Sequence, residues 1–327
     1  MKSLTRAAAR LLLAAGACLA AASAIADGKV GMTLPADFPA PLDASLGQAV
    51  LGFGASGPVT RTPVVFVHGN NDTPFPTETC NPYGRVQAFA QFLADRGYAL
   101  SERWAVGYQG EPCDLLLDQT HRSGPAHTTS ANVPDVRAFV LAVLRYTGAR
   151  QVDVVAHSLG SVIVREWLRQ HPEEGRFVRR FVAIDGANHG IINCSPDPLN
   201  YWQAPSLGGF TPASAVCQEL GSPNTPFLRR LNKGQEAPGA GKDTLVIRNA
   251  DTSFVYFPKQ DGVLAPVPAE DSFGQPTDFS RSAGLKGARE LDLTGQGIYD
   301  EILFTTHLGI LNSPDTWAAT LRFLTEH

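Results

Sequence analysis

Buried strand patterns alternate with helical patterns along most of this chain. A short continuous apolar run, typical of a strand buried on both faces, occurs at residues 62–67, and further strands are predicted at 103–108, 152–155, 177–184, 244–247, 254–257 and 290–293. Apolar residues recur at helical spacing at 83–98, from a cap at Ser130 or Asn132 to Gly148, at 159–170 and at 313–325. Strands joined through helices run parallel, so the sequence predicts an α/β fold, a mainly parallel sheet with helices on both faces.

The N-terminus has the pattern of an export signal. A region with three cationic residues precedes the apolar residues 11–22, and Ala24-Ile25-Ala26 is a small-x-small cleavage site. The alternative is an uncleaved anchor, but the apolar region is shorter than the roughly 20 residues that a membrane span requires. We therefore expect a signal peptide at 1–26 and a secreted or periplasmic protein without a stable membrane anchor.

Four cysteines would remain after cleavage, namely Cys80, Cys113, Cys194 and Cys217. In an oxidising compartment they allow two disulfides in three possible pairings. We favour Cys80 with Cys113 and Cys194 with Cys217, because each pair closes a local loop. A zinc site is disfavoured, because no pair has metal-finger spacing and no histidine lies regularly beside them.

Charge and composition exclude several partners. The chain has 27 Lys plus Arg against 31 Asp plus Glu, a formal net charge of −4, and no basic block that could follow a phosphate backbone. Nucleic acid is therefore not an expected partner, and without a Gly-rich phosphate loop no cofactor is implied. A group of histidines and aspartates has a spacing that fits no metal site, and we expect a polar surface loop there, at His121, His127, Asp114 and Asp118.

The mature chain is predicted to form one domain with two irregular segments. Residues 27–60 are rich in Pro, Gly and Ala without a period, and we expect an extended N-terminal leader on the domain surface. Residues 187–240 mix Pro, Gly, Asn and aromatic residues, also without a period, and are predicted to form a cap-like insertion over the sheet edge. The main domain would span 61–327.

The strongest chemical signal lies where the strand at 152–155 leads into the helix at 159–170. Here Ala156-His157-Ser158-Leu159-Gly160 has the small-x-Ser-x-Gly pattern of a nucleophile elbow. Small residues are needed because the turn is so sharp that larger side chains would collide with the neighbouring strand and helix. We therefore predict that Ser158 is a catalytic nucleophile; the alternative is an ordinary turn in which Ser158 caps the helix.

A second signal, His68-Gly69-Asn70, follows an earlier buried strand. Acyl transfer develops negative charge on a carbonyl oxygen, and fixed N–H donors stabilise that charge. The backbone N–H groups of Asn70 and Leu159 are predicted to form this oxyanion hole, with Asn71 in place of Asn70 if the loop is displaced by one residue. For His68 we prefer a structural role in bracing the loop.

The general base follows by elimination. In the elbow fold the catalytic residues run nucleophile, acid, histidine along the chain. His171 ends the helix after the elbow, His189 precedes every credible acid loop, and His327 is the last residue. His307, between the last strand and the last helix, remains as the predicted base.

The acid is expected in a loop after a late strand, which admits Asp251 and Asp261. Asp261 follows the apolar run at 254–257 and precedes another apolar pair, so it is the first choice, with Asp251 in reserve. Either aspartate could instead be a turn residue that bonds its own backbone.

The motifs resemble a known group of enzymes. The strand and loop at 62–70, the elbow with Ala156 in place of the first glycine, and the Lys259-Gln260-Asp261-Gly262-Val263 loop are similar to secreted α/β-hydrolases of the bacterial lipase and extracellular polyhydroxybutyrate depolymerase group. The resemblance runs from about residue 60 to 185 and resumes at Asp261 and His307. It implies the α/β-hydrolase fold, a triad of Ser158, Asp261 and His307, and a hydrophobic ester as substrate. Residues 187–240 do not match this group.

These observations predict a secreted serine hydrolase that cleaves carboxylic esters through an acyl-enzyme. Apolar and aromatic residues of the insertion favour acyl or polyester substrates and are the candidate substrate-binding residues: Ile191, Ile192, Tyr201, Trp202 and Phe210. A triacylglycerol lipase or a short-chain carboxylesterase is the alternative within the enzyme class. The alternative from another class is a catalytically inactive binding protein on a hydrolase scaffold.

Overall fold

The computed structural model describes most of the chain beyond the predicted signal peptide. Its described residues are 33–44, 47–70, 72–76, 84–108, 128–191, 194, 212–238, 243–249, 270–279, 281–294 and 306–326. The chain divides into two compact units, Met1–Thr33 and Leu34–His327, and the elements described belong to the second. Among the described helices, none combines the length and the apolar character needed to cross a bilayer.

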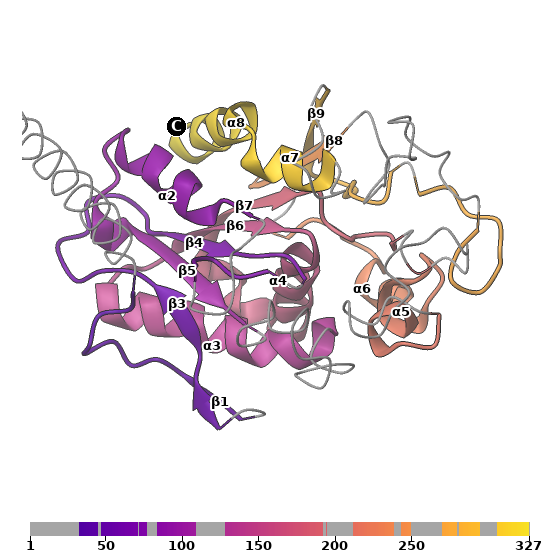
Figure 1. Ribbon diagram of the computed structural model, residues 1–327, viewed down its shortest axis with the longest axis horizontal. Helices are drawn as coiled ribbons and strands as arrows, with labels where there is room; N and C mark the ends of the chain where they lie inside the picture. The colour runs from indigo at the N-terminus through magenta and orange to yellow at the C-terminus, as the bar shows by residue number, and fades with distance from the viewer. Residues whose placement is uncertain are drawn as a thin grey trace, which may run out of the picture. The chain divides into compact units, whose positions relative to one another are not determined.

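A seven-stranded sheet forms the centre of this unit (Figure 1). Its spatial order is β3 (Leu51–Phe53), β5 (Arg103–Gly107), β4 (Val64–Val67), β6 (Val152–His157), β7 (Val178–Ile184), β8 (Thr244–Asn249) and β9 (Arg289–Leu293). β3 pairs antiparallel with β5, and the other neighbouring pairs are parallel. The mainly parallel sheet predicted from the sequence is therefore confirmed, while the strand predicted at 254–257 lies outside the described residues.

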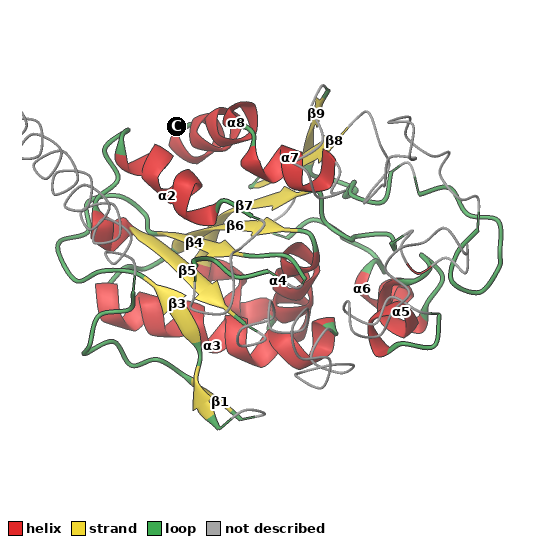
Figure 2. Cartoon of the chain, in the orientation of Figure 1, coloured by secondary structure: helices red, strands yellow, loops and turns green. Residues whose placement is uncertain are grey.

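Helices cover both faces of the sheet (Figure 2). One layer holds α2 (Val86–Ala94), α7 (Thr306–Asn312) and α8 (Pro314–Thr325), and the other holds α3 (Thr129–Thr147) and α4 (Leu159–Gln170). All residues of β4 and β6 are buried, and for β4 the continuous apolar run predicts a strand covered on both sides. Short 3-10 helices precede β5 and β7 at Leu100–Glu102 and Pro172–Phe177.

The start of α3 differs from the prediction. Its N-cap is Thr128, whose side chain accepts from the N–H of Ala131, so the helix begins before the predicted caps at Ser130 and Asn132. Gly148 ends the helix with φ of 68°, as predicted. The first N–H groups are bound by an acid from another segment: Glu219 accepts from the N–H of Thr129 at 2.6 Å. This distant carboxylate was not visible in the local pattern, which explains the shifted start.

Part of the predicted leader belongs to the folded unit. β1 (Leu42–Asp43) and β2 (Gln48–Ala49) form a small hairpin, and β3 joins the main sheet. Upstream, the buried ring of Phe38 packs against Trp104, Phe139 and Tyr146. These short segments lack a detectable period because tertiary pairing, not local pattern, fixes them.

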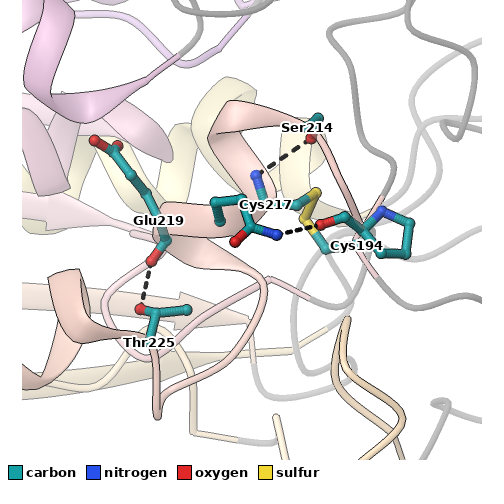
Figure 3. Close-up of a disulfide and its surroundings, with 7 residues drawn as sticks. Cys194, Ser214, Cys217, Glu219 and Thr225 are labelled. Atoms are coloured by element: carbon teal, nitrogen blue, oxygen red, sulfur yellow. Dashed lines mark hydrogen bonds between the residues drawn. A yellow bond between two sulfur atoms is a disulfide. The ribbon is translucent and has the colours of Figure 1, made fainter.

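Two short helices, α5 (Ala215–Leu220) and α6 (Pro226–Leu231), lie within the predicted insertion. The predicted disulfide between Cys194 and Cys217 is present and joins α5 to the segment that follows β7 (Figure 3). Ser214 caps α5, and Thr225 donates its hydroxyl proton to the carbonyl of Glu219. The pairing of Cys80 with Cys113 lies outside the described residues and stays a prediction.

Candidate active site

Ser158 stands at a sharp turn between β6 and α4. Its φ of 54° and ψ of −125° are strained for a residue with a side chain, as an elbow requires. Its N–H donates to the carbonyl of Ile184 on β7 at 3.0 Å. A Cβ added to Gly160 would lie 2.4 Å from the carbonyl oxygen of His68, so only glycine fits two residues after Ser158. The elbow geometry expected from the sequence is thus present.

The loop after β4 packs directly against this turn. A Cβ on Gly69 would lie 3.0 Å from Ser158 Cβ and 2.9 Å from His157 Nδ1, so glycine again permits the close approach. The predicted oxyanion donors belong to the two sides of this contact: Asn70 is half-buried in the loop, and Leu159 opens α4. The N-terminus of a helix favours negative charge, so the location suits a developing oxyanion.

His68 braces the loop. Its ring stacks on Tyr108 at 4.0 Å between centroids, and the Tyr108 hydroxyl donates to the His68 carbonyl at 2.7 Å. Nδ1 lies 2.6 Å from the carbonyl of Gly69, which only accepts, so Nδ1 carries the proton. Burial lowers the pKa of His68 to about 4, so the ring is neutral at physiological pH.

His307 lies in the first turn of α7, a short helix that precedes the predicted last helix. Its Nδ1 is 2.6 Å from Oδ2 of Asp185, and both residues are buried. Asp185 directly follows β7, just as Ser158 directly follows β6, and the two strands pair His157 with Ile184. Ser158 and Asp185 therefore occupy equivalent positions at the ends of adjacent strands.

Asp185 shares a backbone feature with Ser158. Its φ of 44° makes it, with Ser158, one of two non-glycine residues of positive φ in the described part of the chain. Its N–H donates to the carbonyl of Ile247 on β8 at 2.9 Å, which fixes this unusual conformation. Such strain persists only where surrounding contacts enforce it, and it often accompanies a functional site.

His157, the last residue of β6, links the elbow to His307. Its Nε2 lies 3.0 Å from the backbone carbonyl of His307, and the two rings are 4.4 Å apart between centroids. Burial, together with the neighbouring His307, lowers the pKa of His157 well below its ordinary value. The ring is therefore neutral beside the candidate base.

Sequence reasoning missed Asp185 and His157. Asp185 precedes the late-strand loops that are expected to hold the acid, and its place at the end of the strand beside the elbow strand becomes a signal only once β6 and β7 are known to be neighbours. The predicted Asp261 and its alternative Asp251 lie outside the described residues, as do Ile192, Tyr201, Trp202 and Phe210. Ile191 is described: its side chain is buried in the core and its N–H donates to the carbonyl of Leu220.

Among the described residues, one group has side chains close enough together to bind a metal ion, namely His171, Glu173 and Glu174. Their potential ligand atoms all lie within 4.8 Å of one another. The group lies beyond the C-terminus of α4, at the opposite end of that helix from Ser158. The Glu174 carboxylate already accepts hydrogen bonds from Arg137 and Trp167. This engagement argues for a structural role.

A cavity of about 370 Å³ is lined by residues of α4, β7 and the segment after α6. The buried Arg165 is one of its charged lining residues, and the guanidinium donates to Asn188, to Asn232 and to the carbonyl of Glu236. Burial lowers the pKa of Arg165 to about 10. These bonds tie α4 to the predicted insertion, so the cavity wall serves packing rather than the chemistry at Ser158.

The chain is similar to several known proteins. The family model for Lipase (class 2) matches residues 61–262. Among solved structures, Aspergillus fumigatus lipase B is similar at 18% identity and a TM-score of 0.47, over 90% of this chain and 56% of that one. The mature form of Bacillus licheniformis lipase BlEst2 is similar at 17% identity and a TM-score of 0.49, over 84% and 98% of the two chains.

The chain thus spans little more than half the length of the fungal lipase and nearly the whole of the bacterial one. No curated protein matches it in sequence. The family match covers more than half of the chain, including the loop after β4 and the elbow. The protein therefore belongs to the class 2 lipases, ester hydrolases of the α/β-hydrolase fold.

Proposed function

We propose that this protein cleaves carboxylic esters of hydrophobic acyl or polyester substrates, with Ser158 as nucleophile and His307 as general base. The observation that carries the proposal is the 2.6 Å contact between His307 Nδ1 and the buried Asp185 carboxylate, beside the strained turn at Ser158. A histidine oriented by a carboxylate near a half-buried serine at a strand–helix turn is the arrangement that serine hydrolases use.

The tautomer follows from this contact. With the Nδ1 proton donated to a carboxylate, Nε2 of His307 holds the lone pair that takes the Ser158 proton as Oγ attacks the ester carbonyl. The N–H groups of Asn70 and Leu159 would stabilise the oxyanion. His307 then protonates the leaving alcohol, the acyl group stays on Oγ, and water repeats the sequence to release the acid.

Two carboxylates are candidates for orienting His307. The hydrogen bond to Nδ1 supports Asp185. The loop pattern and the family resemblance support Asp261, which keeps its sequence-based prediction. We assign the role to Asp185, and the substitutions Asp185→Asn and Asp261→Asn separate the two aspartates.

Two observations bear on the acyl and alcohol parts of the substrate, and they favour different esters. Membership of the class 2 lipases favours glycerol esters, whereas the sequence resemblance favours amorphous polyhydroxybutyrate. We propose that the aromatic side chains of the insertion, Tyr201, Trp202 and Phe210, contact the apolar chain together with Ile192. Clearing of tributyrin without clearing of amorphous polyhydroxybutyrate would assign a lipase, and the reverse result a polyester depolymerase.

We also propose that the protein is exported. The predicted signal peptide at 1–26 and the disulfide between Cys194 and Cys217 support this location, because disulfides persist in oxidising compartments. Detection of the mature chain, beginning after Ala26, in the periplasm or medium would test it.

Hydrolysis of p-nitrophenyl butyrate and labelling by a fluorophosphonate probe test the proposed chemistry. Ser158→Ala is expected to lower kcat by about 10,000-fold or more and to abolish the label, because it removes the proposed nucleophile. Ser161→Ala is a matched control: Ser161 is buried on the same helix, and its hydroxyl donates to the carbonyl of Ala156. A wild-type protein without label or turnover would favour the inactive binding protein.

A further inference from the structure

We propose that His157 is a positioning residue, which holds the main chain of His307 in register with the nucleophile. The inference rests on the proposed function, because it assigns a role around the same serine and histidine. Nothing in the elbow pattern requires a histidine at this position, since only the residues two before and two after the serine must be small.

The hydrogen bond between the two histidines has a definite direction. His157 Nε2 lies 3.0 Å from the backbone oxygen of His307, and a carbonyl oxygen only accepts. Nε2 therefore carries the proton, and Nδ1 is the unprotonated nitrogen. Among the atoms that the structure describes, buried Nδ1 has no hydrogen-bond partner and lies against Gly69, which agrees with this tautomer.

The covalent position of His157 makes this bond a direct link. His157 immediately precedes Ser158 and ends β6, a fully buried strand that pairs with β4 on one side and β7 on the other, so its backbone is held by the sheet. His307 belongs to a helix of only seven residues, which cannot fix its own orientation without outside contacts. Asp185 holds the imidazole of His307 from one side, and His157 holds the backbone from the other.

The neutral state of His157 suits this role. Its burial and its neighbours His307 and His68 disfavour a charge on its ring. When His307 takes the serine proton during the reaction, a second cation 4.4 Å away would oppose that step. A neutral imidazole donates the same hydrogen bond without this penalty.

Two substitutions separate a positioning role from a packing role. His157→Leu keeps apolar bulk and removes the donor, whereas His157→Gln keeps an N–H donor at a similar reach. We expect His157→Leu to lower kcat on p-nitrophenyl butyrate by about 10- to 100-fold with KM within about twofold, because misplacement of a base by about 1 Å has that cost. His157→Gln should recover most of the lost kcat. His171→Leu, at the far end of α4, is the matched control and should behave as wild type.

Wild-type kcat in folded His157→Leu, or a His157→Gln variant no better than it, would overturn the inference. If His157→Leu does not fold, a long-range proton–nitrogen NMR spectrum of the wild type tests the same bond. It should show His157 as the neutral Nε2–H tautomer, and an Nδ1–H tautomer would overturn the inference. Absence of turnover and of fluorophosphonate label in the wild type would instead refute the proposed function, so the two failures are distinguishable.

Discussion

Opposite ends of the same two strands, β6 and β7, are built in opposite ways. At their amino ends, Arg179 donates to both oxygens of the buried Asp153 at 2.9 and 2.5 Å and to the carbonyl of Leu324 in α8. At their carboxyl ends, Ser158 and Asp185 are held with positive φ. At the amino ends, an ion pair joins residues whose φ angles are negative. At the carboxyl ends, residues with positive φ lie near the neutral side chains of His68 and His157.

The difference follows from the geometry of a parallel sheet. All parallel strands present their carboxyl ends at one edge, where the following helices begin and where helix dipoles favour negative charge. The segments that follow β4, β6 and β7 therefore end at that edge, where Gly69 lies against Ser158 and Asp185 accepts from His307. The amino edge faces the C-terminal end of α8, whose last carbonyls accept hydrogen bonds from Arg179 and Arg180. One edge stabilises the fold, and the other carries the candidate chemistry.

The two edges should also respond to acid in opposite directions. Burial lowers the pKa of His68 to about 4 at the carboxyl edge. Burial raises the pKa of Asp153 to about 6 at the amino edge, against the pull of Arg179. Lowering the pH therefore puts a positive charge on buried His68 at the carboxyl edge, and it removes the negative charge of buried Asp153 at the amino edge.

The largest expected effect is on catalysis and comes from the carboxyl edge. Asp185→Asn should lower kcat by about 10,000-fold, because an amide at this position favours the wrong tautomer of the histidine. Asparagine tolerates positive φ as well as aspartate does, so the backbone at residue 185 should not change. Steady-state kinetics on p-nitrophenyl butyrate measure the effect.

Asp261→Asn and Asp251→Asn are the matched comparisons. If Asp185 alone orients His307, both should retain most of the activity. A full loss in Asp261→Asn with near-wild-type kcat in Asp185→Asn would return the role to the residue predicted from the sequence. Large losses in both would mean that two carboxylates serve one imidazole.

The next effect is on stability and comes from the amino edge. Arg179→Met leaves the Asp153 carboxylate buried without its partner and should lower the free energy of unfolding by about 3–5 kcal/mol near neutral pH. The loss should shrink at about pH 4, because Asp153 is then protonated and no buried charge needs a partner. Urea denaturation at the two pH values measures both results.

Activity of the folded Arg179→Met protein should remain that of wild type, which separates this edge from the catalytic one. Arg289→Met is the control, because its ion pair with Glu326 is exposed and should contribute little to stability. The same loss at both pH values would show that the carbonyl of Leu324, rather than Asp153, is the partner that matters.

How much the sequence could predict also differs between parts of the molecule. The elbow was predictable because a buried strand, small residues and an amphipathic helix follow each other within a few residues, so local pattern and fold agree. The pairing of Cys194 with Cys217 was predictable because the loop between them is short. β3 and the helices α5 and α6 were missed, since such short elements carry too few residues for a period to emerge.

The site itself was only partly predictable. Chain order led to His307, but it could not show which carboxylate reaches Nδ1, because that depends on how the sheet brings distant strand ends together. Asp185 has the same relation to β7 as Ser158 has to β6, a relation that appears once the strands are known to be neighbours. The contact of His157 with a backbone carbonyl 150 residues away leaves no trace in the sequence.

The smallest of these effects tests the acid response of the carboxyl edge. The pKa of His68 is lower in the folded chain than in the unfolded one, so the unfolded chain takes up its proton first as the pH falls. The stability due to neutral His68 is therefore complete above about pH 6.5 and is lost toward about pH 4, a change of about 3 kcal/mol.

His68→Asn keeps a donor near Nδ1 but cannot titrate, so its unfolding free energy should fall less over this range. Asp153 contributes equally to both proteins and cancels from the difference, while His171→Asn, altered at a partly exposed side chain far from the elbow, should keep the wild-type slope. Parallel slopes for wild type and His68→Asn in urea denaturation would place the acid sensitivity elsewhere and remove the contrast between the two edges.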